Sequence, residues 1–447
     1  MFGRILLAVG ITSLTAPCQS NVWAYSPSHP TVKVYDTWVI PPSLGQVSVQ
    51  PRYCSGSIIV KFIDECPAED RDEIVARYGC AIAQTCEGDR FHCVRIPPEE
   101  TPDRMVSLLE MEDAVEYAEL NYYASIYFVP DDPYYFPYQW DLQNDVTGGI
   151  NMQAAWDIET GDPNVIVAIL DTGIAYEDYG DFQQAPDLAQ TRFVPGYDFV
   201  NDDAHPNDDR GHGTHMAGTI AQSTNNDRGV AGIAFGCSIM PVKVLADDGI
   251  GDYFDIARGI YYGAENGAHV LNMSFGGPDR SRTIEQAVAF AYGSGVTIVC
   301  AAGNDFKDGN PPSYPAAYND YCIAVGAVRY DDTRAYYSNT GAYLDVVAPG
   351  GDLLVDQNED GYPDGIIQQT FTADPSTFNY YFFQGTSSAA AHVSGVAALL
   401  ISQGLTDPDA VRAAIEGAAR DVGPTGWDAQ YGWGVVDAHA ALLYGAP

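Results

Sequence analysis

The chain has 447 residues, 46% of them hydrophobic, which is enough for a full globular core and argues against disorder. Its 60 acidic and 21 basic side chains give a formal net charge of −39. This charge argues against nucleic acid or anionic membrane as a partner, because both are polyanions, and it favours bound cations.

The first 24 residues have the pattern of a secretory signal peptide. Arg4 gives a positive start, residues 5–14 form an apolar core, and Ala24 closes a cleavage signal. The apolar core is too short to span a membrane as a helix, which takes about 18 residues or more. We therefore expect a secreted, extracellular protein. Residues 25–52 contain Pro and Ser with few helix signals and are interpreted as an extension or linker.

Residues 53–127 are predicted to form a separate small unit. Strand patterns at 56–63 and 89–96 alternate with helix patterns at 68–79 and 102–112, and a final strand begins at 115. This β-α-β-β-α-β-like order is typical of a ferredoxin-like α+β fold. An unrelated small domain is the alternative interpretation.

Three short peptides place an Asp, a His and a Ser in the pattern of a nucleophilic triad. Asp171 follows the apolar run NVIVAIL, which predicts a buried parallel strand ending at that carboxylate. His212 opens the helix-like stretch HGTHMAGTIAQ, and Ser387 opens the apolar helix SAAAHVSGVAALL. A serine hydroxyl needs an imidazole to take its proton, and the imidazole needs a carboxylate to fix its tautomer.

Each of these residues has an ordinary alternative when taken alone. An Asp after a strand is commonly a turn residue, and a Ser at a helix start is commonly an N-cap. Asn304 ends the strand pattern VTIVCAAGN and adds a fourth group, an amide that can donate to an oxyanion beside the Ser387 N–H. Together the four favour a catalytic site. Ser387 is preferred over Ser388 because it follows Gly-Thr directly, and two further imidazoles are interpreted as structural: His215 and His392.

With LNMSFGG between His212 and Asn304, these motifs stand in the order of the subtilase family of serine proteases, which the chain resembles from about Asp131 to Ala441. DDPYY, NMQAAWDI and STNNDRGVAGIA are similar to its thermitase-like branch. The resemblance implies a three-layer α/β sandwich with a mostly parallel central sheet over residues 128–447. It also implies a serine endopeptidase that hydrolyses protein or peptide substrates through an acyl-enzyme. We expect a monomer.

The same resemblance gives the small unit a role. Residues 53–127 are similar to the inhibitory propeptide of subtilisins, which assists folding and leaves its C-terminal tail in the active site. The stretch EYAELNYYASIY aligns with that tail, which implies that the zymogen cuts itself after Tyr127.

Three oxygen-rich clusters are candidate calcium sites. The first matches the strong site of the thermitase-like branch, with side chains and backbone carbonyls from Asp132, Asp187, Ser223, Asn226, Arg228 and Val230. The second falls where that branch has a further site near the catalytic His: Asp198, Asn201, Asp203 and Asn207. The third lies in an insertion and has the alternating spacing of an EF-hand loop: Asp356, Asn358, Asp360 and Asp364. For each cluster a solvated acidic turn is the alternative.

The resemblance also implies the substrate contacts. The backbone from Ser274 to Gly276 is expected to pair with an extended substrate as an added strand. Two pockets are predicted: an apolar one from Tyr253, Ile256 and Phe275, and a main pocket with the small, uncharged Ser313 at its base. A preference for large apolar residues follows. The alternative is that these residues are ordinary core.

Nine cysteines are present, and secretion permits disulfides. Five fall in the propeptide unit and could give two bridges there: Cys54, Cys66, Cys80, Cys86 and Cys93. Cys300 and Cys322 lie at opposite ends of neighbouring predicted strands, so buried free thiols are expected.

Two other functions remain open from the motifs. A binding or inhibitor protein that keeps the fold would be indicated by the loss of a triad residue, and no such loss occurs. An esterase or acyltransferase would use the same triad, because esters and amides pass through the same chemistry.

Overall fold

The computed structural model describes residues 38–39, 53–86, 88, 90–122, 128–143 and 146–444. The predicted signal peptide, most of the predicted linker and the predicted cut after Tyr127 lie outside the described residues.

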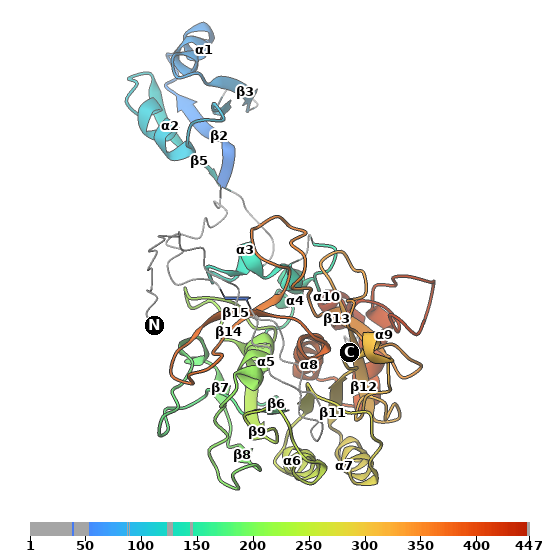
Figure 1. The fold of residues 1–447 in the computed structure, drawn as a ribbon. Helices are drawn as coiled ribbons and strands as arrows, with labels where there is room; N and C mark the ends of the chain where they lie inside the picture. The colour runs from blue at the N-terminus through green and yellow to red at the C-terminus, as the bar shows by residue number, and fades with distance from the viewer. Residues whose placement is uncertain are drawn as a thin grey trace, which may run out of the picture. The chain divides into compact units, whose positions relative to one another are not determined.

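The small N-terminal unit is an antiparallel sheet with two helices (Figure 1). Its elements in chain order are β2 (Tyr53–Phe62), α1 (Ala68–Arg77), β3 (Ala81–Thr85), β4 (His92–Arg95), α2 (Pro102–Leu109) and β5 (Val115–Tyr122). The strand order is β3-β4-β2-β5. Ile58, Val60, Met105 and Leu109 are among the buried residues of its core. The observed order agrees with the predicted ferredoxin-like arrangement.

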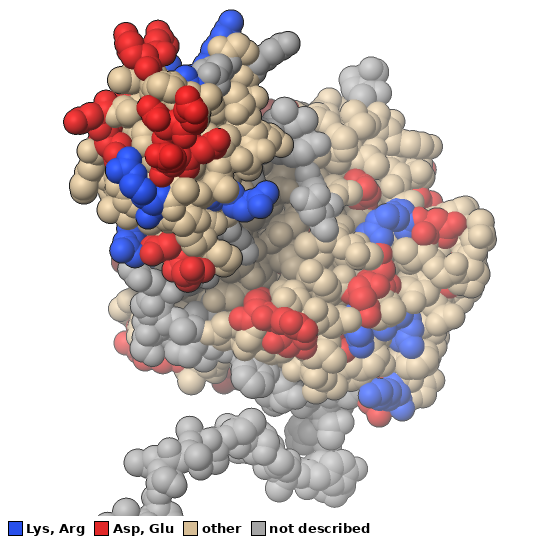
Figure 2. Space-filling view, turned by 90° about the horizontal axis from the view of Figure 1, so that it is seen from above, with Lys and Arg blue, Asp and Glu red and all other residues tan. Residues whose placement is uncertain are grey.

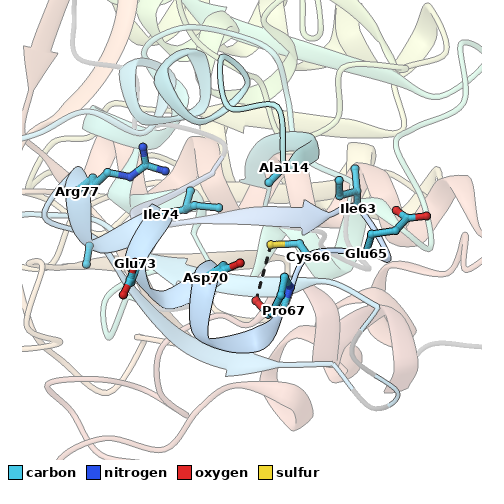
Figure 3. Close-up of a pocket in the computed structure, with 10 residues that line it drawn as sticks. Ile63, Glu65, Cys66, Pro67, Asp70, Glu73, Ile74, Arg77 and Ala114 are labelled. Atoms are coloured by element: carbon cyan, nitrogen blue, oxygen red, sulfur yellow. Dashed lines mark hydrogen bonds between the residues drawn. The ribbon is translucent and has the colours of Figure 1, made fainter.

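One hollow on this unit has a volume of 940 Å³ and opens beside α1 (Figure 3). Ile63 and Ala114 lie at one side of it, and Glu73 and Arg77 of α1 lie at the other. None of the predicted catalytic or substrate-binding residues lines this hollow.

The larger unit is built on a parallel sheet with strand order β13-β12-β11-β10-β6-β9-β7. The strands in chain order are β6 (Ile166–Asp171), β7 (Arg192–Phe193), β8 (Tyr197–Asp198), β9 (Ser238–Lys243), β10 (Val270–Met273), β11 (Thr297–Ala301), β12 (Cys322–Val328) and β13 (Val346–Pro349). Every strand pair in this sheet is parallel, including β8 with β9.

Helices cover both faces of this sheet, and the strands are therefore apolar on both sides. In β6, Val167 and Ile169 belong to one core cluster and Ala168 and Leu170 to the other. The first cluster includes residues of α4 (Met152–Trp156), α5 (His212–Ala221), α8 (Thr386–Ser402), α9 (Pro408–Ala418) and α10 (Ala438–Tyr444). The second includes residues of α6 (Tyr253–Glu265) and α7 (Arg282–Gly293). This is the predicted three-layer α/β sandwich (Figure 1).

The insertion between β13 and α8 forms a hairpin that the sequence did not predict. Its strands are β14 (Ile366–Thr370) and β15 (Asn379–Phe383), and β1 (Trp38–Val39) pairs with β15. Short helical segments complete the larger unit: α3 (Tyr135–Tyr138), η1 (Trp140–Leu142), η2 (Pro186–Leu188) and η3 (Phe306–Asp308).

Within the described ranges, no helix combines the length and the hydropathy that a membrane span requires. In the view of Figure 2, basic side chains lie among acidic ones and form no large basic patch on that face.

Candidate active site

Asp171 and His212 form a hydrogen-bonded pair at the C-terminal edge of the parallel sheet. Asp171 ends β6, and its buried Oδ1 accepts hydrogen bonds from His212 Nδ1 at 2.7 Å and from Thr172 N at 2.7 Å. Because a carboxylate can only accept, Nδ1 carries the proton and Nε2 is the basic nitrogen of the neutral ring. Burial lowers the pKa of His212, but the charge and the hydrogen bond of Asp171 outweigh burial and raise the pKa above its ordinary value.

A second buried carboxylate, which the sequence did not single out, holds the loop that carries His212. Asp208 Oδ1 accepts from Thr172 Oγ1, Arg210 N and Gly211 N, at 2.8 to 2.9 Å. Its Oδ2 accepts from the backbone and hydroxyl of Thr214. Asp208 therefore joins the end of β6 to the first turn of α5.

A buried lysine lies beneath the same edge. Lys243 pairs with Asp171 in the sheet register and is only 1% exposed. Its Nζ donates to Thr172 O, Asp209 Oδ1 and Leu245 O at 2.7 to 2.9 Å. These bonds satisfy all three ammonium hydrogens and fix the backbone just after Asp171.

Ser387 is the second residue of α8 and is 4% exposed. Its Oγ donates to Ser274 O at 2.8 Å, and Ser274 Oγ donates to Ser387 O at 3.0 Å. This reciprocal pair ties the helix start to the segment after β10, the segment predicted to bind substrate backbone. Asn272 extends the connection by donating to Ser274 Oγ at 3.0 Å.

Asn304 lies beside the start of α8 and is oriented by Thr386. Its Oδ1 accepts from Thr386 N at 2.9 Å and from Thr386 Oγ1 at 3.0 Å. With the oxygen fixed in this way, the amide Nδ2 is the donor that Asn304 has for an oxyanion. Thr386 is thus a further residue of the candidate site, and the sequence motifs did not single it out.

The two additional histidines, His215 and His392, are held by packing and hydrogen-bond contacts within the protein. His215 stacks on Phe383 at 4.1 Å, and its Nε2 lies 3.0 Å from Ile366 O. Burial lowers the pKa of His215 to about 3, so its ring is neutral. His392 contacts Ser388 O at 2.8 Å and Asp141 Oδ2 at 2.9 Å. The structural interpretation of both residues agrees with these contacts.

The structure groups the predicted pocket residues in two places. Tyr253, Ile256 and Phe275 belong to one apolar cluster, in which Ile256 is 4% exposed and the two rings are partly buried. Ser313 lies between Gly276 and Gly303: a Cβ added at these glycines would come within 2.1 Å of Ser313 Oγ and 3.1 Å of Ser313 Cβ. A side chain at Gly276 would therefore collide with Ser313, and one at Gly303 would be in tight contact with it.

The first calcium cluster brings two buried carboxylates together. Asp132 and Asp187 are 3% and 0% exposed, and Asp132 Oδ1 has no hydrogen-bond partner. Burial raises the pKa of Asp132 to about 7, with a further contribution from the Asp187 charge. Asn226 donates through Nδ2 to Asp187 Oδ1 at 3.0 Å. No ion pair to either carboxylate occurs in the described part of the chain.

In the second cluster the two carboxylates accept hydrogen bonds from their own loop, whereas the buried Asn207 Oδ1 has no hydrogen-bond partner. Asp198 accepts from Val200 N and Asn201 N at 2.8 Å and from Asn201 Nδ2 at 2.9 Å. Asp203 accepts from His205 N at 2.8 Å. These contacts are those of an acidic turn, and calcium at this cluster stays a prediction.

In the third cluster, Asp356 accepts from Asp360 N and Gly361 N, and Asp364 is 2% exposed. Across all described residues, no group of three or more His, Cys, Asp or Glu side chains is gathered closely enough to hold a metal ion. The predicted sites therefore depend on amide and backbone oxygens as well as on carboxylates.

The predicted disulfides of the propeptide unit are absent. Cys66, Cys80, Cys86 and Cys93 carry free thiols, and Cys80 Sγ contacts Met105 Sδ at 3.7 Å. Two bridges would need four of the five cysteines, so the prediction is wrong in this structure. The packing of Cys66 and Cys80 into the apolar core explains the difference. Cys300 and Cys322 are buried free thiols, as expected.

Comparisons with known proteins agree with this architecture. The model of the subtilase family matches residues 162–434, and a model of the fervidolysin N-terminal prodomain matches residues 43–121. A thermophilic serine proteinase of Bacillus sp. strain AK1 is 34% identical over 411 residues, which are 90% of this chain and 92% of that protein. Thermitase of Thermoactinomyces vulgaris is 37% identical over 317 residues, 71% of this chain and all of thermitase.

One further sequence relative and one solved structure are also similar to this chain. A halolysin-like extracellular serine protease of Natrialba magadii is 36% identical over 369 residues, 81% of this chain and 62% of that protein. The solved structure of a protease from Pseudoalteromonas arctica aligns with a TM-score of 0.61 at 33% identity, covering 71% of this chain and all of that chain. The chain belongs to the subtilase family, as a serine endopeptidase of its thermitase-like branch with an N-terminal prodomain.

Proposed function

We propose that this endopeptidase cleaves peptide bonds with Ser387 as nucleophile, His212 as general base and then acid, and Asp171 as the group that orients His212. The observation that carries the proposal is the 2.7 Å bond from His212 Nδ1 to the buried Asp171 Oδ1. That bond leaves Nε2 as the basic nitrogen, and the raised pKa of His212 strengthens it as a base.

The reaction follows from these roles. Ser387 Oγ attacks the scissile carbonyl carbon while its proton passes to His212 Nε2. His212 then gives that proton to the leaving amine, and the acyl-enzyme ester remains. A water that loses a proton to His212 hydrolyses the ester and restores Ser387. In the structure the Ser387 hydroxyl donates to Ser274 O, so this hydrogen bond must be released before the attack.

The tetrahedral oxyanion would be bound by Asn304 Nδ2 and by the backbone N–H of Ser387 at the start of α8. Thr386 supports this role because its backbone N–H and its hydroxyl both donate to Asn304 Oδ1, which leaves the amide nitrogen of Asn304 pointing away from Thr386.

Replacing Asn304 with alanine should lower kcat about 10²–10³-fold with little change in KM, the loss known for this donor in subtilisin, a relative. Thr386→Ala should lower kcat less, because it removes only one of the two bonds that orient the amide. Thr386→Ser keeps the hydroxyl and serves as the matched control. Steady-state kinetics on a peptide anilide measures all three, and an unchanged kcat in Asn304→Ala would contradict the role.

Casein digestion by the purified protein, with and without a serine-directed sulfonyl fluoride, tests the proposed function. Proteolysis that the reagent abolishes is the expected result. Hydrolysis of small esters without cleavage of casein or peptides would instead favour the esterase interpretation.

For specificity, we propose a preference for large apolar residues in both pockets. A peptide library should show aromatic or long aliphatic residues at the scissile position and an apolar residue three positions further toward the N-terminus. Burying such a side chain contributes about 1.5–3 kcal/mol, roughly 10–150-fold in kcat/KM. A dominant preference for Arg, Lys, Asp or Glu at the scissile position would contradict it.

Secretion and zymogen processing are part of the proposal. Residues 1–24 have the signal pattern, and the relative from Natrialba magadii is named as extracellular. The prodomain match at residues 43–121 supports an intramolecular inhibitor that is removed after Tyr127.

We also propose that calcium is a structural cofactor. The residues of the first cluster fit a hard cation, because Asp132 has a buried oxygen without a partner and Asp187 is buried beside it. Asp132, Asp187, Asn226 and the carbonyls around residues 223–230 would hold the ion. Asn226 would have to turn its amide, since its Oδ1 accepts from Arg228 N in the structure.

Excess chelator should therefore lower the melting temperature of the protein. A ligand bound only to the folded state stabilises it by about 2.7 kcal/mol at a hundredfold excess over Kd. Calorimetry with calcium and with EDTA measures the shift, and Asp132→Asn should reduce it. An equal melting temperature in both conditions would contradict a stabilising calcium ion.

A further inference from the structure

The inserted loop before β14 is folded around one carboxylate. Asp356 accepts hydrogen bonds from Asp360 N at 3.2 Å through Oδ1 and from Gly361 N at 3.1 Å through Oδ2. Gly361 has φ +91°, a conformation that glycine adopts without strain. Asp360 Oδ1 in turn accepts from Tyr362 N at 2.8 Å. These hydrogen bonds close a tight turn that brings the side-chain oxygens of Asp356, Asn358 and Asp360 near one another.

Buried oxygens without partners lie in this loop. Asp364 is 2% exposed; its Oδ2 accepts from Gln357 N at 2.8 Å, and its Oδ1 has no partner. Gln357 Oε1 is also buried without a partner. A buried ionised carboxylate is costly unless a positive charge or hydrogen bonds compensate it. An ion at this place would supply the missing partner to Asp364 Oδ1.

The described residues supply no cationic side chain to this loop. The terminal nitrogens of Arg329 pair with Asp331 at 3.1 Å and with Asp352 at 3.4 Å, and its buried Nε has no partner. Asp356, Asp360 and Asp364 form no ion pair within the described ranges. A hard divalent cation with carboxylate, amide and carbonyl ligands matches this set of oxygens. Since three carboxylates are not gathered in the structure, the ion would have to draw them together.

The loop continues directly into the hairpin β14–β15, which contacts α5 and leads to the start of α8. Trp140 Nε1 donates to Gly365 O at 3.1 Å where the loop ends. In β14, Thr370 Oγ1 donates to Gly211 O, the residue before His212, at 2.5 Å. His215 Nε2 contacts Ile366 O and Tyr381 O at 3.0 and 3.2 Å, one on each strand.

The other strand of the hairpin leads to the nucleophile. β15 ends at Phe383, four residues before Ser387, and the intervening Gly385 donates its N–H to Gly350 O at 2.9 Å. Gly350 lies at the start of the same insertion. The position of the loop therefore bears on both α5 and the start of α8.

We propose that residues 356–364 bind one calcium ion and that this ion fixes the hairpin β14–β15 against α5, so that the loop positions His212 and Ser387 from outside the active site. The binding part stands independently of the proposed catalytic roles, whereas the positioning part rests on them. Asp356, Asp364 and their neighbours are positioning residues in this proposal.

Equilibrium dialysis against calcium tests the site, with the full chain carrying Ser387→Ala to prevent self-digestion. In that background Asp364→Asn should bind one calcium ion fewer per chain, and Asp356→Asn should give the same loss. Asp364→Asn keeps a side-chain oxygen that can accept from Gln357 N, so this variant should fold. If it does not fold, Asp356→Asn gives a second test of the same site. Asp374→Asn is the matched control, an exposed Asp at the turn of the same insertion, bonded to Ser376 N.

The calcium ion bound by this loop must also be distinguished from the ion proposed at the first cluster. Adding Asp132→Asn to Asp364→Asn should remove two ions in total. Equal calcium binding in Asp364→Asn, Asp356→Asn and Asp374→Asn would overturn the site, whatever the protease assay shows.

Hydrogen exchange tests the positioning. In the Ser387→Ala chain, removal of calcium should speed amide exchange in residues 366–383 and in the first turn of α5. Asp364→Asn should exchange fast there even in calcium, while Asp374→Asn should behave like its parent. Exchange of residues 366–383 that does not depend on calcium would overturn the positioning role.

Discussion

Ser387→Ala is expected to abolish proteolysis, while Ser388→Ala keeps it. Ser387 Oγ lies at the start of α8 and bonds Ser274 O, on the segment where substrate backbone should pair. The neighbouring Ser388 is 1% exposed, and its carbonyl is the partner of His392. In subtilisin, a relative, loss of the nucleophile lowers kcat about 10⁶-fold, and we expect the same order here. Active-site titration and kinetics on a peptide anilide measure both variants.

The same pair of variants reports on maturation. Ser387→Ala should accumulate as an uncut precursor, whereas the parent and Ser388→Ala should begin at Phe128. Phe128 supports this start, because its N–H donates to Asp157 Oδ1 at 2.7 Å and its ring packs on Trp156 at 5.8 Å. N-terminal sequencing decides the start. An inactive Ser388→Ala beside an active Ser387→Ala would reassign the nucleophile.

Much of the fold follows from the sequence because periodicity and burial are strongly linked. Residues 165–170, before Asp171, are apolar at every position because their side chains enter two cores in alternation. By contrast β3 was not predicted: in Ala81–Thr85 four of five side chains are exposed, so the strand has no apolar alternation. The hairpin β14–β15 was also missed, since it includes polar residues such as Gln368 and Gln369 that are buried against neighbours far away in the chain.

Some residues of the candidate site could likewise be predicted from the sequence, and others could not. The triad candidates and Asn304 stand in short motifs at the ends of predicted elements, and parallel strands bring those ends together. Asp208, Lys243 and Thr386 carry no such signal. Their roles depend on hydrogen bonds to residues distant in the chain, such as Thr172 for Asp208 and Asn304 for Thr386. They are recognised by a buried polar or charged group with several hydrogen-bond partners, and those partners are brought together only in the folded chain.

Asp171→Asn is expected to lower kcat about 10⁴-fold and to leave the protein folded. The carboxylate accepts the Nδ1–H of His212 at 2.7 Å and its charge stabilises the imidazolium that forms when Ser387 loses its proton. An asparagine removes that charge and can offer a donor to Nδ1, which would favour the wrong tautomer. Asp171 Oδ2 is buried without a partner, so the fold does not depend on a second bond there. Calorimetry should show that the melting temperature is not lowered.

The pH dependence of kcat/KM in Asp171→Asn distinguishes the loss of the Asp171 charge from a nonspecific disturbance of the site. His212 must be neutral to accept the Ser387 proton, so kcat/KM of the parent falls as the pH drops through the raised pKa of His212. Asp171 raises that pKa, and without its charge the acid limb of the residual activity should move to lower pH. Asp181→Asn, an exposed Asp, is the matched control and should keep both the rate and the profile. A rate within tenfold of the parent, or an acid limb that stays in place, would mean that Asp171 does not hold the charge that His212 needs.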